Sequence, residues 1–334
     1  MSGGSARPLV VVWRITEACD LSCWFCEYNR RLLRPRHVTP AADALRFGRV
    51  LADYASTSGR PVLVSWLGGE PLVWPPLVEV GQRFKQDFGL LLGLTTNGRQ
   101  LDRPGLIQHL AETYAEITVS VDGLAATHDA GRGAPGLFEQ LRVAVAELHA
   151  LKIRKGSGPR LRANTILMRS NLHSLETLCA ELANWGIEEL TFNVLGGRPP
   201  GPDYWRERLM PDELAWLCST LPGIRQRLAG QRLRLLGSER YLGRLATSAA
   251  GQNEPVIDCH PGAGFLFVDE HGRVAPCSFT SAGYGVNISD LQSGADLARL
   301  PGRFAAERGA EALPPCRDCQ STQVFGKFEP AEAA

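Results

Sequence analysis

The stretch PLVVVWRITEACDLSCWFC, residues 8 to 26, decides how the rest of the chain is interpreted. Its first half is a short run of β-branched and aromatic residues, which predicts a buried strand over 8–15. Its second half places Cys19, Cys23 and Cys26 in a C-x3-C-x2-C loop directly after that strand. Three thiolates this close in sequence can ligate three irons of a cubane cluster and leave the fourth iron open to another ligand.

The pattern of the first strand is repeated along the first two hundred residues. Further strands are predicted over 61–68, 91–96, 116–121, 160–168 and 189–195, with longer amphipathic segments between them. Six strand–helix units in succession predict a parallel sheet of the α/β class, curved into a partial (β/α)6 barrel of the TIM type. Functional residues are then expected at the carboxyl ends of the strands.

The pattern changes after residue 195. Residues 196–205 predict a loop, 211–249 predict helix, and GFLFVDEHGRVAPC (264–277) predicts a hairpin that turns at His271 and Gly272. We therefore expect a barrel core over 1–200, a helical connection over 201–250, a small cluster-binding domain over 251–325 and a tail over 326–334.

Composition excludes several classes of partner. The 334 residues carry a formal net charge of +1, so no global field favours nucleic acid or an anionic membrane surface. No apolar run is long enough to span a bilayer, and the first residues lack a secretion signal, which predicts a cytoplasmic protein. In a reducing cytoplasm the nine cysteines, seven of them in spaced groups, indicate metal rather than disulfides.

The cysteine loop carries a family resemblance. Its spacing, Phe25 before the last cysteine, and its place after the first strand resemble the signature of the radical SAM superfamily, and the likeness extends over nearly the whole chain. The resemblance implies a 4Fe-4S cluster that binds S-adenosylmethionine (SAM) and cleaves it to a 5'-deoxyadenosyl radical, with an electron donor such as flavodoxin or ferredoxin. A zinc knuckle normally needs four ligands, and the loop offers three.

Further motifs follow the later strands in the family's order. GGEP at 68–71 resembles the motif that binds the SAM amino group, and the residues after strands three to six resemble positions that contact the ribose, polar groups and adenine. The arginine of an HDxxRG-like stretch could meet the SAM carboxylate or fasten a loop. The implied cofactor-binding residues are Phe25, Gly68, Gly69, Glu70, Pro71, Asn97, Ser120, Asp122, Arg132, Asn164 and Leu195.

A second group of cysteines lies near the end of the chain: Cys259, Cys277, Cys316 and Cys319. Four thiolates can fully ligate one cubane cluster or close a zinc site. The first pair resembles the opening of the SPASM extension, and the absence of further cysteines after Cys319 fits its shortened form, Twitch. The resemblance implies an auxiliary 4Fe-4S cluster that accepts an electron from a substrate radical.

Cys179 and Cys218 stand among leucines at helical spacing, which is typical of small buried core residues. Alternatively, one of them gives a hydrogen atom to a substrate radical, as in the family's epimerases.

The expected activity is dehydrogenation, epimerisation or rearrangement of a small natural-product substrate such as a sugar, aminocyclitol or nucleoside. The first alternative is SPASM-type modification of a ribosomal peptide or protein. Seven residues precede the first strand, so we expect no fused leader-peptide-binding domain, which favours a small molecule. The second alternative, from another class, is a non-catalytic zinc-binding scaffold.

Overall fold

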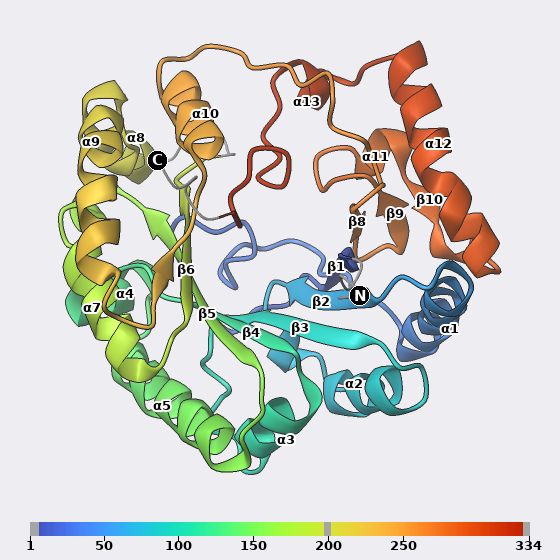
Figure 1. Ribbon diagram of the computed structural model, residues 1–334, viewed down its shortest axis with the longest axis horizontal. Helices are drawn as coiled ribbons and strands as arrows, with labels where there is room; N and C mark the ends of the chain where they lie inside the picture. Colours follow the sequence, from blue (N-terminus) through green and yellow to red (C-terminus); the bar gives the residue numbers. More distant parts are fainter. Residues whose placement is uncertain (1–6, 197–201, 330–334) are drawn as a thin grey trace, which may run out of the picture.

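The computed structural model describes residues 7–196 and 202–329, and within them the strands form a single sheet. Its order is β10-β9-β8-β1-β2-β3-β4-β5-β6-β7. The sheet curls into a ring, with most of the helices on its outside (Figure 1). The parallel core consists of β1 (Leu9–Thr16), β2 (Val62–Gly68), β3 (Leu91–Thr96), β4 (Glu116–Ser120), β5 (Arg160–Leu167) and β6 (Glu189–Val194).

This architecture confirms the predicted partial TIM-type barrel. Each of the six predicted core strands is present, with both ends within one residue of the prediction. The hairpin is also present: β8 (Phe265–Val268) and β9 (Arg273–Ala275) pair antiparallel, and Gly272 has φ +75° in the turn. A positive φ suits glycine because it has no Cβ.

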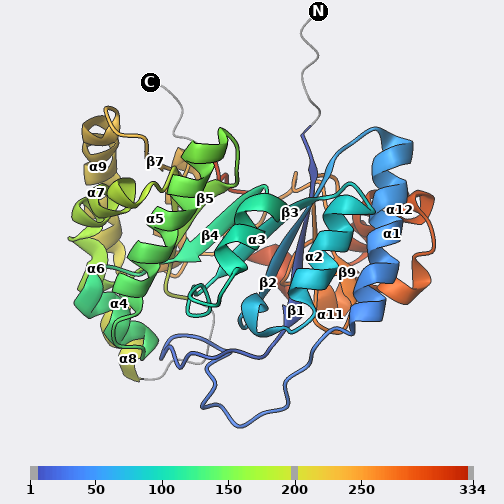
Figure 2. The same cartoon turned by 90° about the horizontal axis from the view of Figure 1, so that it is seen from below.

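Alternating side chains divide the barrel into an inner and an outer face. On β1, Leu9, Val11 and Trp13 are buried, whereas the residues between them are half-buried. Trp13 and Trp66 pack with Phe47 of α1 and Phe84 of α2 in the outer layer. The outer helices are α1 (Ala41–Ser58), α2 (Leu77–Gln86), α3 (Leu106–Thr113), α4 (Ala125–Arg132), α5 (Leu137–Lys155), α6 (Arg169–Leu172) and α7 (Leu175–Trp185) (Figure 2).

Two predictions about the segment after β6 need correction. Residues 202–205 were expected in a loop but belong to α8 (Pro202–Glu207), while 197–201 lie outside the described residues. The segment 211–249 is not all helix, because β7 (Arg234–Leu235) separates α9 (Pro211–Leu228) from α10 (Glu239–Ala249). β7 extends the sheet by pairing with Glu189 and Leu190, a long-range contact that local periodicity does not reveal.

The last third of the chain completes the ring. β8 pairs in parallel with β1, and β10 (Val286–Asn287) continues the sheet beyond β9. α11 (Ser281–Tyr284) follows β9, and α12 (Gly294–Ala310) begins against α1, where the Gly294 N–H donates to Asp53 at 2.6 Å. After α13 (Pro314–Arg317) the chain turns into the middle of the ring (Figure 1).

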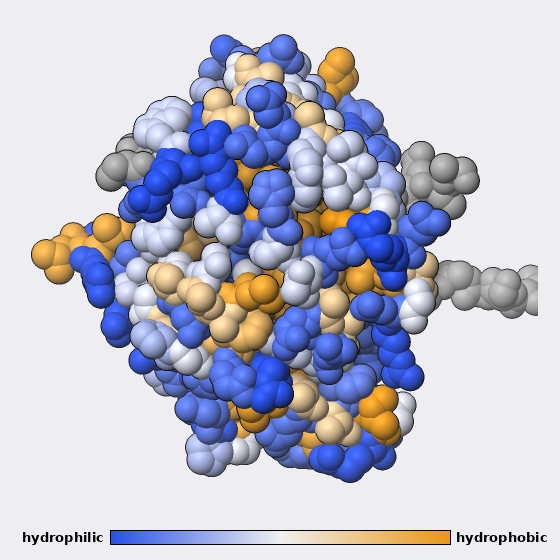
Figure 3. All heavy atoms as spheres, turned by 90° about the vertical axis from the view of Figure 1, so that its left-hand side faces the viewer, coloured by the Kyte–Doolittle hydropathy of each residue, from blue (hydrophilic) through white to orange (hydrophobic). Residues whose placement is uncertain are grey.

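The outside of the molecule is polar where α5, α7 and α9 face solvent. Figure 3 shows this side as mostly hydrophilic, with apolar atoms in small, separate patches. Among the described helices none combines the length and the apolar character that crossing a bilayer requires.

Candidate functional site

The first cysteine group lies in the loop that leaves the carboxyl end of β1. Cys23 is buried and Cys19 and Cys26 are half-buried. Burial, with a smaller contribution from the neighbouring thiols and carboxylates, raises the pKa of Cys19 to about 11 and that of Cys23 to about 12. Thiols held in this way need a strong Lewis acid to become thiolates, and iron ligation provides one. The donor set therefore fits the three-cysteine cluster.

The end of β2 presses directly against this loop. The Gly69 N–H donates to Thr16 O at 2.7 Å, and the Glu70 N–H donates to Ala18 O at 2.8 Å. A Cβ on Gly69 would lie 2.3 Å from Ala18 O, which is closer than real contacts allow. The glycine of the GGEP motif is thus needed where two backbones meet.

Glu70 is the centre of a buried hydrogen-bond network. Its side chain is 1% exposed and accepts from Thr96 Oγ1 at 2.7 Å, the Asn97 N–H at 2.6 Å and the Leu72 N–H at 3.0 Å. Desolvation outweighs these bonds and raises the pKa of Glu70 to about 7. Pro71 opens the 3-10 turn η1 (Pro71–Val73) that presents the Leu72 N–H.

Asn97 joins this network to the cysteine loop. Its Nδ2 donates to Asp20 Oδ1 at 2.9 Å and lies 3.8 Å from Cys19 Sγ. The ends of β2 and β3 and the cluster loop therefore form one continuous polar structure, and Gly68, Gly69, Glu70, Pro71 and Asn97 lie together, as the motif order predicts.

Asp122 and Arg132 form a buried ion pair. Arg132 Nη2 lies 2.7 Å from Asp122 Oδ2, and Asp122 Oδ1 accepts from the Ile166 N–H at 2.9 Å. The guanidinium also lies 5.9 Å from the ring centre of Phe25. Through these contacts Arg132 connects α4 to the segment after β4 and to the cysteine loop. A contact of Arg132 or Asp122 with SAM stays a prediction.

The remaining SAM positions lie on the inner face of the barrel. Ser120 and Asn164 are register partners on β4 and β5, and Thr191 is the partner of Asn164 on β6. Asn164 Oδ1 accepts from Thr191 Oγ1 at 3.1 Å and from Lys327 Nζ at 2.7 Å. Leu195 is buried just after β6. Sequence reasoning missed Lys327, which lies in the expected tail and belongs to no motif.

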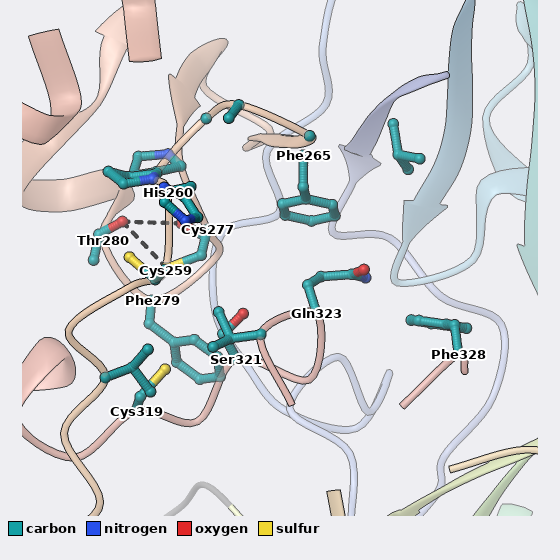
Figure 4. Close-up of a pocket in the computed structure, with 18 of the residues that line it drawn as sticks. Cys259, His260, Phe265, Cys277, Phe279, Thr280, Cys319, Ser321, Gln323 and Phe328 are labelled. Atoms are coloured by element: carbon teal, nitrogen blue, oxygen red, sulfur yellow. Dashed lines mark hydrogen bonds between the residues drawn. The ribbon is translucent and has the colours of Figure 1, made fainter. Parts of the chain in front are cut away.

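The second cysteine group lines one cavity of about 730 Å³. Cys259, Cys277, Cys316 and Cys319 all contribute to its wall, and Figure 4 shows Cys259, Cys277 and Cys319 around it. Burial raises the pKa of Cys259, Cys277 and Cys319, and the nearby thiols of the group add to the shift. Thr280 Oγ1 lies 3.3 Å from Cys277 Sγ.

The two cysteine groups lie at opposite ends of the barrel strands. The first loop follows the carboxyl end of β1, whereas the cavity is also lined by Leu63, Leu91, Glu116 and Arg160, at or beside the amino ends of β2 to β5. Within 7–196 and 202–329, no three His, Cys, Asp or Glu side chains converge on a position for a single metal ion.

The two remaining cysteines differ in burial. Cys179 is buried in α7, and burial raises its pKa to about 12; Cys218 is half-buried in α9, and burial raises its pKa as well. A hydrogen-atom donor role for either one stays a prediction.

Comparison with known proteins defines the class. The Radical SAM superfamily matches residues 13–180, so the chain belongs to this superfamily and is an enzyme of it. Membership implies a 4Fe-4S cluster and SAM as cofactors.

Individual relatives extend over most of the chain. An AdoMet-dependent heme synthase of Methanosarcina barkeri is 28% identical over 81% of this chain and 77% of its own length. The PqqA peptide cyclase of Rhodopseudomonas palustris is 26% identical over 96% of this chain and 81% of its own length. The structure of Streptococcus suis SuiB bound to S-adenosylmethionine has a TM-score of 0.65 and 16% identity, over 98% of this chain and 77% of that one.

Proposed function

We propose that this enzyme binds a second, auxiliary 4Fe-4S cluster through Cys259, Cys277, Cys316 and Cys319, in a Twitch-like region, and uses it in the oxidative modification of a peptide substrate. The observation that carries the proposal is the shared cavity. Four thiols from three separate segments, before β8, after β9 and around α13, line the same wall. A closed set of four thiolates suits an electron-transfer cluster.

The residues of the first site have separate tasks in this proposal. Cys19, Cys23 and Cys26 hold the SAM-binding cluster, Glu70 accepts a hydrogen bond from the SAM ammonium, and Ser120 and Asn164 line the nucleoside. A cluster held by these three cysteines would supply the electron for cleavage of SAM to methionine and a 5'-deoxyadenosyl radical. The buried pair of Asp122 and Arg132 holds the loop that shields this site.

The substrate class differs from the one expected first. The relatives above are a heme synthase and a peptide cyclase, and neither is a sugar, aminocyclitol or nucleoside dehydrogenase. The peptide cyclase matches 96% of this chain, an extent that must include cysteines of the second group. This supports peptide modification over the reaction of a sugar, aminocyclitol or nucleoside. A flavodoxin or ferredoxin as electron donor and a cytoplasmic location belong to the same proposal.

Anaerobic reconstitution tests the two-cluster arrangement. The wild-type chain should hold about eight irons, since two cubanes contain that many, and should cleave SAM to 5'-deoxyadenosine under reducing conditions. The double variant Cys316→Ala/Cys319→Ala should hold about four irons and still cleave SAM, because the first cluster is intact. Cys218→Ala is the matched control and should behave as wild type.

Two results would contradict the proposal. About four irons in the wild-type chain would show that the second group binds no cubane. Zinc at that group, with SAM cleavage unaffected, would identify a structural metal site instead.

A further inference from the structure

Lys327 is a buried lysine that enters the barrel from the end of the chain. It is 5% exposed, and its Nζ donates to Asn164 Oδ1 at 2.7 Å. The segment around it is held by Ser238, the residue before α10. Ser238 Oγ donates to Phe325 O at 2.8 Å and the Ser238 N–H donates to Gly326 O at 3.1 Å. Its position in the barrel is therefore set by the fold.

The partners of Lys327 are an amide oxygen of Asn164 and the ring of Phe328, whose centre lies 5.2 Å from Nζ, and neither carries a negative charge. Among the described residues, no carboxylate lies within ion-pair distance of its Nζ. The other three lysines of the chain differ: Lys152 and Lys155 pair with Glu188 and Glu112, and Lys85 is exposed. An ammonium group has three hydrogens to donate, and Asn164 accepts only one of them.

The neighbouring charge makes this position still less favourable for a lone cation. Arg162 lies below Asn164 on β5, where it pairs with Glu189 and Glu116. Burial first, and the Arg162 charge second, lower the pKa of Lys327 to about 7. Glu116 and Glu189 are occupied by Arg162, so they do not serve as counter-ions to Lys327.

The inner face beside Lys327 is polar and incompletely covered. Ser120, Asn164 and Asn193 are half-buried, although their strand neighbours Val119, Ala163 and Phe192 are fully buried against the outer layer. These half-buried side chains point to the inside of the barrel. Their partial exposure means that other side chains do not completely fill the barrel interior at this level. A ligand group can therefore reach the layer of Ser120, Asn164 and Asn193.

We infer that Lys327 binds a carboxylate group of the substrate inside the barrel, next to the residues that line SAM. The inference rests on the proposed function, since it names a substrate feature of the same site. A carboxylate supplies the counter-charge and the acceptors that Lys327 lacks, and the Asn164 amide, fixed by Thr191, orients the ammonium. Lys327 is thus a specificity-determining residue that favours acidic substrates.

Chemical labelling of the wild-type holoenzyme tests this inference without a known substrate. Acetylation by acetic anhydride in the presence of SAM, followed by mass spectrometry, gives the rate at each of the four lysines. Butyrate is the probe, and butyramide is its neutral isostere. A bound carboxylate raises the pKa of Lys327, and a rise of about one unit lowers its labelling rate about fivefold at pH 7. Lys85 is the internal control and should not change.

A second measurement uses variants. Equilibrium dialysis should show binding of radiolabelled butyrate to wild type and to Lys327→Arg, and at least a fivefold loss in Lys327→Met. If Lys327→Met does not fold, the labelling of wild type decides alone. Equal protection by butyrate and butyramide, or none by either, would overturn the inference. Iron content and SAM cleavage are measured on the same sample, so that failure of the clusters and failure of the carboxylate site are distinguishable.

Discussion

Glu70 is a buried carboxyl group whose pKa lies near 7 because it is desolvated, although three donated hydrogen bonds oppose that shift. Below that pH it is neutral in the free protein. The SAM ammonium needs the ionised form, so we expect SAM affinity to be full above pH 7 and to fall about tenfold per pH unit below it. Equilibrium dialysis of SAM against the reconstituted protein from pH 5 to 8 measures this dependence.

Glu70→Gln provides the control, because its amide cannot titrate. We expect the variant to bind SAM more weakly above pH 7 and without pH dependence between 5 and 7. The same slope in wild type and variant would assign the titration to another group and would contradict the role given to Glu70.

Gly69 tests the close approach of two backbones. Gly69→Ala places a methyl group against Ala18 O and Glu17 O, so the loop with the first cysteines has to move. We expect a loss of about 1–3 kcal/mol in the free energy of unfolding, as overpacking typically costs. Gly243→Ala in α10, where a Cβ meets nothing within 4 Å, is the matched control and should be neutral or slightly stabilising. Urea denaturation compares the two, and equal midpoints would contradict the argument.

At the residue scale, sequence reasoning succeeded where chemistry is local to a motif. The three cysteines, GGEP and Asn97 could be placed together because each follows a strand end, and parallel strand ends share one edge. Lys327 could not be found in this way. Its neighbour Asn164 is 163 residues away in the chain, and nothing in the local sequence FGKFEP indicates burial.

At the element scale, α4 is fastened to the cysteine loop mainly by Arg132. Removing its charge in Arg132→Met leaves Asp122 buried without a counter-ion, which we expect to cost about 3–5 kcal/mol of unfolding free energy. Arg206→Met breaks the exposed pair with Asp203 and should cost less than about 1 kcal/mol. Urea denaturation of the two variants checks the contrast.

Iron content gives a second readout for Arg132→Met. Because the Trp24 N–H donates to Gly131 O at 3.4 Å and the Phe25 ring lies against Arg132, a looser α4 should weaken the first cluster and spare the second. Unchanged stability and iron content, with weaker SAM binding, would instead assign Arg132 to the SAM carboxylate.

Strands and helices were predictable to different degrees. The core strands are rich in β-branched and apolar residues because helices bury their outer face, and such segments are visible in the sequence. β7 has only two residues and exists because Glu189 and Leu190 offer a free strand edge. α8 follows a run of glycine and proline that indicates a loop, so its helical turn depends on contacts made by the folded chain.

At the scale of the whole molecule, the barrel and the cysteine-bearing region share one sheet. β8 pairs with β1 along Val10 to Trp13, and α12 packs against α1 with Phe304 fully buried. A chain shortened to residues 1–250 would turn β1 into an exposed apolar edge and uncover part of the outer core. Such an edge favours aggregation.

We therefore expect the chain 1–250 to aggregate and to lack a cooperative thermal transition. A chain that ends at Glu329 keeps every contact described above and should unfold as the full chain does. Differential scanning calorimetry and size-exclusion chromatography of the three lengths measure this. If 1–250 is monomeric and unfolds cooperatively near the full chain's temperature, the barrel core is an independent domain. In that case the second cluster region is an appendage, and the shared sheet contributes little to its stability.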